Sequence, residues 1–436
     1  MAGIDGGMAA LGGFGGLFLL ALLRVPVGFA MLIAGLGGIA ALIGFNPAAA
    51  VAVQSPLRTL TGYDMLLIPM FIAMSALANH TGLGRELYTA GHAWAGRARG
   101  GLGLATILAS AGFAGICGSS VASTAAMARV ALPEMRARGY APGFAAGTVA
   151  AGGTLGILIP PSLVLALYGL LTEQDIGRLF VAGLVPGVLA VALYALTVTL
   201  IARRRPEAAP GGAPAGWAER FASLRGLWAV AAIFLGIIGG LYLGVFAPSE
   251  AGAMGALAVA AVGLIRGRLT LAAVGGALTE AARSAASVMV VLIGALVFGY
   301  FLALTRAPQL LVQALTETGL SPWGVMAAML AGYFLLGCVL DTLAMIVLTV
   351  PITYPVAVAL GFDPIWFGVV VTMTVEIGLI TPPYGLNVLV LNTIARDVGL
   401  ATIYRGVAPF VAADLVRVFL ICLAPGIVLW LPSTMG

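Results

Sequence analysis

Two short polar segments interrupt apolar parts of this 436-residue chain. The first contains Ser119 and Ser120, and the second, far along the chain, contains Asp341 and Thr342. Hydroxyl, carboxylate and free carbonyl oxygens are the ligands that small hard cations prefer. A carboxylate inside a membrane segment costs about 2.5 to 3.5 kcal/mol on insertion scales and is by default a functional residue. We therefore expect cation binding at both segments.

A second pair of breaks follows, with Pro160, Pro161 and Ser162 in one copy and Pro382, Pro383 and Tyr384 in the other. Consecutive prolines remove two amide donors and clash with the preceding turn, so a helix must open there and leave carbonyls unpaired. Polar or flexible residues flank these breaks: Gly156, Glu376, Thr381 and Asn387. Glu376 could carry a proton or hydrogen-bond the broken backbone, and the sequence leaves both readings open.

These breaks belong to an internal repeat. Residues 115–161 and 337–383 align without a gap, and the coincident residues are mainly glycines and prolines. Both residue types break helices. Matching interruptions of apolar runs in two halves of a membrane chain are the best sequence indication of a transport site.

The composition indicates a helical integral membrane protein. The chain is 61% hydrophobic and 8% charged, whereas soluble domains are about a quarter charged. All 21 basic residues are arginines in short clusters between apolar runs. This pattern is typical of cytoplasmic loops and argues against a nucleic-acid partner. Three scattered cysteines and two histidines indicate neither a disulfide framework nor a zinc site.

The apolar runs predict the domain organisation. Residues 1–202 form a first repeat with three spans, a hairpin at about 101–135, a broken helix at about 141–170 and one more span. Residues 203–222 form a flexible cytoplasmic linker, because Pro, Gly and Ala dominate them. Residues 223–436 repeat the plan, with three spans, a hairpin at about 322–360, a broken helix at about 364–394 and a final span.

The arginines predict orientation. Arg97 and Arg99 precede the first hairpin, and Arg136 and Arg138 follow it, so both of its ends should lie in the cytoplasm. The second hairpin lies in a stretch without basic residues and should enter from outside. Five runs lie between the hairpins, and an odd number of crossings inverts the second half. A plain twelve-helix chain is the alternative.

The repeated motifs resemble those of the large membrane subunit (DctM-type) of tripartite ATP-independent periplasmic (TRAP) transporters. They are GICGSSVASTAAMARVALPEM, GYAPGFAAG, GGTLGILIPPS, GCVLDTLAMIVLTVPITYPVA, GFDPIWFGVVV and EIGLITPPYGLNV. The resemblance implies an all-α, inverted-repeat elevator-type transporter with two re-entrant hairpins and two broken helices. It also implies a multi-pass protein of the bacterial inner membrane that imports a small organic anion, a carboxylate, by sodium symport.

The resemblance further implies roles for particular residues. One sodium site would use Ser119, Ser120 and the Gly156 region, and the other would use Asp341, Thr342, Thr381 and Asn387. The substrate would lie between Ser162 and Tyr384, beside Pro160, Pro161, Pro382 and Pro383. Related divalent-anion sodium symporters carry Ser-Asn-Thr at the hairpin tips. Here the tips read Gly118-Ser119-Ser120 and Leu340-Asp341-Thr342, so side-chain ligands differ.

The expected partners are a small four-helix membrane subunit on a separate chain, a periplasmic substrate-binding protein and the lipid bilayer. No cofactor is expected besides the coupling sodium ions. One alternative is a stand-alone sodium/anion symporter without a binding protein. A remote alternative is an intramembrane serine hydrolase using Ser119 or Ser120, which lacks a matching base because His80 and His92 lie elsewhere. We therefore expect a secondary transporter and no enzyme.

Overall fold

The computed structural model describes residues 6–212, 215–317 and 319–435, and in that part of the chain every regular element is a helix. The first half contains α1 (Gly6–Leu22), α2 (Val27–Ile43), α3 (Phe45–Thr61), η1 (Tyr63–Leu66), α4 (Leu67–Thr81), α5 (Leu83–Ala95), α6 (Gly101–Cys117), α7 (Ser120–Ala137), α8 (Pro142–Leu158), α9 (Leu163–Thr172) and α10 (Ile176–Arg204). The second contains α11 (Trp217–Leu224), α12 (Trp228–Tyr242), α13 (Pro248–Ile265), α14 (Leu271–Thr305), α15 (Ala307–Glu317), α16 (Pro322–Gly337), α17 (Thr342–Ala359), α18 (Pro364–Gly378), α19 (Leu386–Ile394), α20 (Leu400–Leu423), α21 (Gly426–Leu429) and η2 (Pro432–Thr434).

The internal repeat of the sequence reappears in the helix boundaries. In the register that aligns residue 115 with residue 337, helices α6, α7 and α8 fall on 323–339, 342–359 and 364–380, close to the observed α16, α17 and α18. The match fails before the hairpins. There α3 and the segment η1–α4 meet at a 64° bend, whereas the equivalent region of the second half is the continuous 35-residue helix α14.

Each predicted hairpin begins and ends at one place in the structure. The amide of Gly100, before α6, donates to Ala209, and the amide of Ala141, after α7, donates to Ala208, both at 3.0 Å. In the second half Trp323, at the start of α16, packs on Phe362, just after α17, with ring centroids 5.0 Å apart. Both helix pairs therefore return to the end from which they start.

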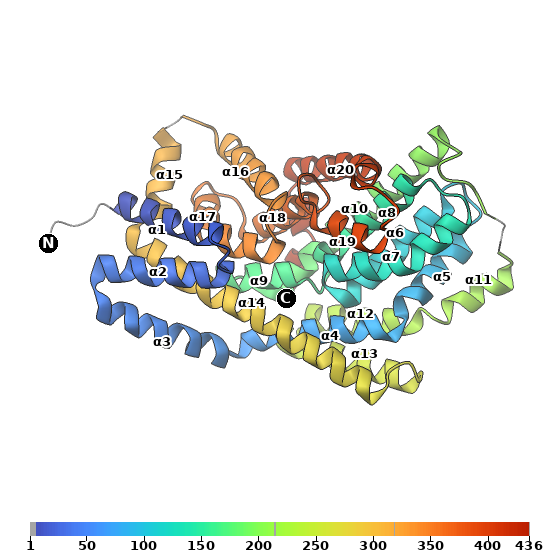
Figure 1. The fold of residues 1–436 in the computed structure, drawn as a ribbon, viewed down its shortest axis with the longest axis horizontal. Coiled ribbons are helices and arrows are strands. Elements are labelled where there is room, and N and C mark those ends of the chain that lie inside the picture. The colour runs from blue at the N-terminus through green and yellow to red at the C-terminus, as the bar shows by residue number, and fades with distance from the viewer. Residues whose placement is uncertain (1–5, 213–214, 318, 436) are drawn as a thin grey trace.

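The two halves pack crosswise (Figure 1). Helix α7 of the first half packs on α19 of the second, and α17 of the second packs on α9 of the first. Because α7 matches α17 and α9 matches α19, the two contacts are equivalents of each other. The hairpin of one half is thus held against the broken helix of the other.

The connection at 205–212 is packed against the hairpin loops. Besides the two bonds from Gly100 and Ala141, the amide of Gly212 donates to Gly96 at 3.0 Å. This part of the expected flexible linker is thus hydrogen-bonded to neighbouring loops. Residues 213–214 of the expected linker and residues 1–5 of the first repeat lie outside the described chain.

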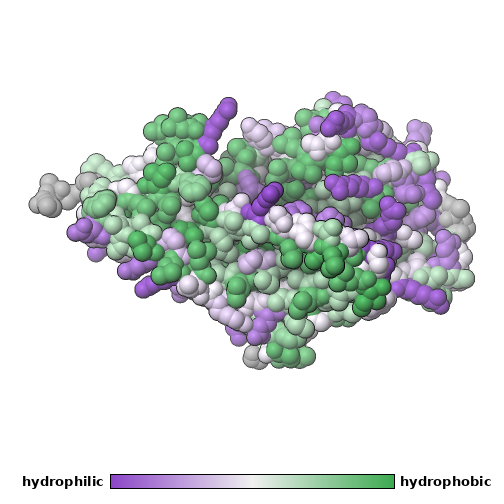
Figure 2. Space-filling model, turned by 60° about the horizontal axis from the view of Figure 1, so that its bottom comes forward, coloured by the Kyte–Doolittle hydropathy of each residue, from purple (hydrophilic) through white to green (hydrophobic). Residues whose placement is uncertain are grey.

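The exposed arginines of these loops share one end of the molecule. They are Arg97, Arg99, Arg136, Arg138 and Arg203 to Arg205. Figure 2 shows hydrophilic residues gathered at the right-hand end and hydrophobic residues over much of the remaining face. The positions of Arg97 and Arg136 on one side disfavour the plain twelve-helix alternative, which needs them on opposite sides.

Four further helices were not predicted as separate elements: α3, α5, α11 and α15. The search for long apolar runs missed them because polar residues interrupt each one, as Gln54 and Arg58 do in α3. Helix α11 begins inside the expected linker and ends beyond it, at Leu224.

The structure contains fewer helices of spanning length than the twelve apolar segments predicted from the sequence, which include two hairpins and two broken helices. Within the described residues, six helices or continuous helix pairs are long and apolar enough to cross a membrane, or up to eight if each of two bent pairs counts as one span. Helices α6 and α16 have 17 and 16 residues, shorter than the roughly 20 residues that a span needs. Short hairpin arms are one reason for the lower count.

Glycines allow the backbones of α2 and α14 to contact each other where the two helices cross. A Cβ atom on Gly294 would lie 2.1 Å from the carbonyl oxygen of Gly28, too close for any side chain. Close approach through small residues is the usual basis of helix association in membranes. Gly276 lies on the same helix, and nothing lies within 4 Å of its Cβ position.

We predict that Gly294→Ala destabilises the protein by about 1–3 kcal/mol, because the methyl group forces the two backbones apart. Gly276→Ala is the matched control and should be neutral or stabilising by up to about 1 kcal/mol, because alanine favours a helix over glycine. Thermal unfolding of the purified protein in detergent distinguishes them. Equal melting temperatures would show that the close crossing is unimportant.

Candidate ion and substrate site

The tip of the first hairpin fits into the first helix break. Gly118 has a left-handed φ of +63°, which turns the chain between α6 and α7. A Cβ on Gly118 would lie 2.6 Å from the carbonyl oxygen of Pro161, and a Cβ on Gly156 would lie 2.8 Å from that of Ser119. The structure therefore brings together Ser119, Gly156 and Pro161, three of the predicted site residues.

Serine side chains cap the two helices that begin at this point. The hydroxyl of Ser119 accepts from the Ala122 amide at 3.4 Å and starts α7, while that of Ser162 accepts from the Leu165 amide at 3.2 Å and starts α9. Ser162 also donates to the carbonyl of Ile157. Such caps satisfy amides that would otherwise be unpaired. Pro160, Pro161 and Ser162 are all buried.

Ser120 is joined to the second half of the chain. The side-chain amide of Asn387, on α19, donates to the Ser120 hydroxyl, and both residues are buried. The family resemblance grouped Asn387 with Asp341, Thr342 and Thr381. Because α19 crosses α7, Asn387 also contacts the first hairpin.

Asp341 caps a helix at the second hairpin tip. Its Oδ2 accepts from the amides of Leu343 and Ala344, at 3.1 and 3.5 Å, and begins α17. A carboxylate at a helix N-terminus is also favoured by the helix dipole. Asp341 is exposed and the neighbouring Thr342 is buried. The carboxylate is therefore reachable from solvent while fixed to its own helix.

The second break is open, unlike the first. Pro382, Pro383 and Tyr384 are exposed, Tyr384 by 58%. The Tyr384 amide donates to Cys338 at the hairpin tip at 3.1 Å, and its carbonyl accepts from Tyr404 at 2.8 Å. Thr381 is half-buried, and its hydroxyl donates to Ile377. The two matched breaks therefore differ in access rather than in plan.

Contacts connect the N-termini of four interior helices. Gly118 links α7 to α9, since its Cβ position lies 4.0 Å from the Leu163 amide nitrogen. The bond between Ser120 and Asn387 links α7 to α19, and that between Tyr384 and Cys338 links the start of α19 to the tip before α17. Helix N-termini carry partial positive charge and favour anions. The arrangement is suited to hold an anion.

A buried ionic cluster lies behind the second break, and only one of its members was singled out from the sequence. Glu376 pairs with Arg417 at 3.0 Å, and Arg417 pairs with Asp414 at 3.0 Å; all three side chains are at most 1% exposed. The sequence feature that could have indicated this cluster is the pair Asp414 and Arg417, two opposite charges three residues apart in an apolar run. Glu376 thus lies against a buried arginine, a contact that neither interpretation of the sequence anticipated.

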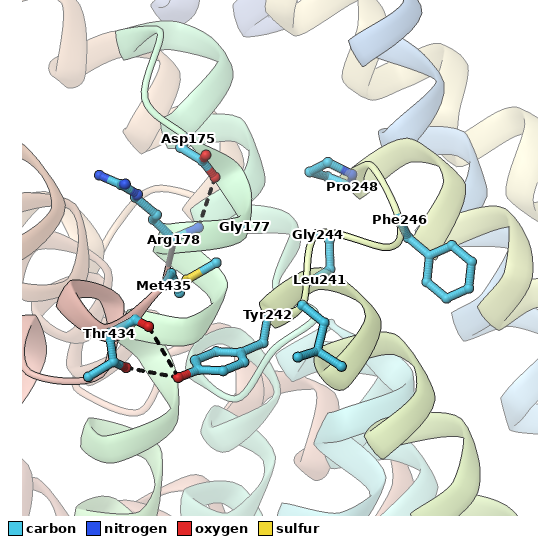
Figure 3. Close-up of a pocket in the computed structure, with 11 residues that line it drawn as sticks. Asp175, Gly177, Arg178, Leu241, Tyr242, Gly244, Phe246, Pro248, Thr434 and Met435 are labelled. Carbon is cyan, nitrogen blue, oxygen red and sulfur yellow. Dashed lines mark hydrogen bonds between the residues drawn. The ribbon is translucent and has the colours of Figure 1, made fainter.

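A cavity of about 610 Å³ lies away from all of these residues. Its lining includes Asp175, Arg178, Tyr242 and Thr434, from the start of α10, the end of α12 and the C-terminal segment. Figure 3 shows the Tyr242 hydroxyl pointing at Thr434, to which it is bonded at 3.0 Å. None of the predicted sodium or substrate residues lines this cavity.

Comparison with known proteins identifies close relationships over nearly the whole chain. Residues 14–427 match the model of the family described as "Tripartite ATP-independent periplasmic transporter, DctM component". The chain is 34% identical over 405 residues to the C4-dicarboxylate TRAP transporter large permease protein DctM of Pseudomonas aeruginosa, covering 92% of this chain and 94% of that protein.

Two further relatives are named for different substrates. The sialic acid TRAP transporter large permease protein SiaM of Vibrio cholerae is 31% identical, with 94% of this chain and 95% of that protein covered. The isethionate TRAP transporter permease protein DctMQ of Oleidesulfovibrio alaskensis is 30% identical, with 95% of this chain and 65% of that protein covered.

A solved structure has a similar fold. The YdaH transporter of Alcanivorax borkumensis aligns with a TM-score of 0.58 at 14% sequence identity, covering 89% of this chain and 88% of that chain. At this level of identity the similarity concerns the fold alone.

We predict that Ser120 and Asn387 are energetically coupled. Ser120→Ala, Asn387→Ala and the double variant should give an interaction energy of about 0.5–3 kcal/mol in thermal unfolding, because each single change leaves the other buried group unpaired. Ser119→Ala combined with Asn387→Ala is the matched control. Its effects should add, since Ser119 bonds its own helix. Additivity for Ser120 would contradict the observed contact.

Proposed function

Since the chain belongs to the DctM component family of tripartite ATP-independent periplasmic (TRAP) transporters, we propose that it imports a small organic anion across the bacterial inner membrane by sodium symport. It is a transporter and not an enzyme. The relatives are named for C4-dicarboxylates, sialic acid and isethionate. All of these are organic anions, and we propose a carboxylate for this chain.

The series of contacts that joins four helix N-termini supports an anionic substrate most directly. In secondary transporters such helix ends point at anionic groups near the middle of the membrane. In this proposal the substrate lies between Ser162 and Tyr384, with Pro160, Pro161, Pro382 and Pro383 shaping the two breaks. Because Ser162 is buried and Tyr384 is exposed, the substrate would reach the Tyr384 side first.

Two groups of oxygen ligands support the sodium sites. The first group is Ser119, Ser120 and the backbone near Gly156. The second is Asp341, Thr342, Thr381 and Asn387, whose side-chain amide also reaches Ser120 of the first group. In both, irregular backbone is tolerated at membrane depth only where it is buried in protein or lines a cavity. Sodium binding would use the carbonyls that such backbone leaves free.

We propose that the two halves are an inverted repeat with re-entrant hairpins. The return of each hairpin to its starting end supports this topology. The arginines near the first hairpin support a cytoplasmic position for that end. The second hairpin would then open to the periplasm.

The crosswise packing supports an elevator motion as the transport mechanism. The contacts of α7 with α19 and of α9 with α17 join both hairpins and both broken helices into one unit. That unit would slide against a scaffold containing α2 and α14. The bound anion and sodium ions would move with it between the two sides of the membrane.

Two protein partners complete the proposed system. A periplasmic binding protein would deliver the anion, and a small four-helix subunit would support the scaffold. The DctMQ relative supports the small subunit. Its name combines two components, and this chain covers only 65% of its length, which leaves room for the second component.

We expect uptake in proteoliposomes to require a sodium gradient, the small subunit and a loaded binding protein. The measurement is accumulation of labelled carboxylates, each omitted component being its own control. Full uptake with this chain and sodium alone would instead support the stand-alone symporter. Uptake without sodium would reject sodium symport.

The cap at Asp341 allows ion binding to be separated from stability. Asp341→Asn keeps a good helix cap but removes the charge, whereas Asp341→Ala removes both and should destabilise by about 0.5–2 kcal/mol. We predict that both variants lose sodium activation of uptake, while only Asp341→Ala lowers the melting temperature. Normal sodium activation in Asp341→Asn would remove the carboxylate from the site.

A further inference from the structure

The buried cluster behind the second break contains two carboxyl groups and one guanidinium group. Glu376 lies on α18, and Asp414 and Arg417 lie on α20. The neighbouring helices add hydroxyl groups, with Tyr194 on α10 bonded to Asp414 at 2.7 Å and Thr154 on α8 lying 3.1 Å from Tyr194. Each half of the chain thus supplies two of the four helices that enclose the cluster.

A single nitrogen serves both carboxyl groups. Nη2 of Arg417 lies 3.0 Å from Oε2 of Glu376 and 3.0 Å from Oδ1 of Asp414. Strong guanidinium–carboxylate pairs instead use two parallel bonds to one carboxylate. Among the described residues, no second cation is ion-paired with either carboxylate. With both ionised, the cluster would keep one uncompensated negative charge, which buried sites avoid by binding a proton.

The contacts identify the oxygen that is free to carry a proton. Neither Oδ1 of Asp414 nor Oε1 of Glu376 receives a hydrogen bond from a described residue, but Oδ1 lies 3.0 Å from Nη2 of Arg417, and the other Asp414 oxygen accepts from the Tyr194 hydroxyl. Among the described residues, Oε1 of Glu376 has neither an ion-pair nor a hydrogen-bond partner. The Thr154 hydroxyl also faces Glu376, but its hydrogen is directed to the Ala151 carbonyl at 2.7 Å. Thr154 can therefore accept a hydrogen bond from a protonated carboxyl.

We propose that Glu376 is a proton-binding site, protonated at Oε1 in this state of the transporter, so that the cluster with Arg417 and Asp414 is neutral as a whole. This goes beyond the sodium-driven transport proposed above. Glu376 and Thr154 occupy equivalent positions of the internal repeat. If Glu376 is protonated, each of the two equivalent positions carries a neutral O–H group. Glu376 lies two residues before Gly378, and Thr154 lies two residues before Gly156; at these glycines each broken helix contacts a hairpin.

Infrared difference spectroscopy tests the proposal on the purified chain in nanodiscs at neutral pH. We expect the carbonyl band of a protonated carboxylic acid in the wild type and its loss in Glu376→Gln. Asp414→Asn should also lose the band, because one carboxylate then balances Arg417 and no proton is needed, so isotope labelling makes the assignment. Labelling the side-chain carboxyl carbons of glutamate with ¹³C should shift the band, whereas the same labelling of aspartate is the matched control and should leave it in place. The proposal is overturned if the band is absent from the wild type, or if aspartate labelling rather than glutamate labelling shifts it.

A stability measurement keeps the test independent of how well the variants express. The wild type should lose thermal stability as the pH is raised above about 4.3, where a glutamate of the unfolded chain ionises, because only the folded chain then holds the proton on Glu376; Glu376→Gln should not show that loss. The groups facing Glu376 in this titration are Arg417, Asp414 and Tyr194. A wild type whose stability instead requires sodium through Glu376 would show a bound cation there and overturn the proposal.

Discussion

The need to satisfy backbone amides at helix breaks is the constraint on which this structure depends. A helix that starts inside a membrane protein has unpaired amide groups, and no bulk water is available to bind them. Ser119, Ser162 and Asp341 each provide a side-chain cap at such a start. The polar residues that suggest ion binding therefore have a structural role as helix caps. Any role in transport is additional to this structural role.

The shared plan of the two halves makes their differences informative. Ser119 and Asp341 are equivalent caps, but only the second adds a charge. The first break is buried and the second is exposed. The hydrogen bond from Asn387 to Ser120 has no polar equivalent, because the matching positions are Leu165 and Thr342. Asymmetry of this kind is expected where two similar half-sites hold different ligands.

Much of the fold could be predicted from sequence because glycine and proline act locally. Gly118 and the paired prolines mark the breaks, and the gap-free alignment of the repeat places matching helices within a few positions of each other. Contacts between distant segments could not be predicted in this way. Nothing local indicates that Asn387 lies on Ser120 or that Glu376 faces Arg417. Short helices with polar residues, such as α3, were missed because they lack long apolar runs.

The crosswise packing also has a consequence for how the protein is made. When the ribosome has completed α7 and α9, their partners α19 and α17 have not yet been synthesised. The first half must therefore wait in the bilayer with its inner surfaces uncovered until the last quarter of the chain emerges. The chain can reach its native arrangement only late in synthesis, and a truncated product would lack the partners of both first-half helices.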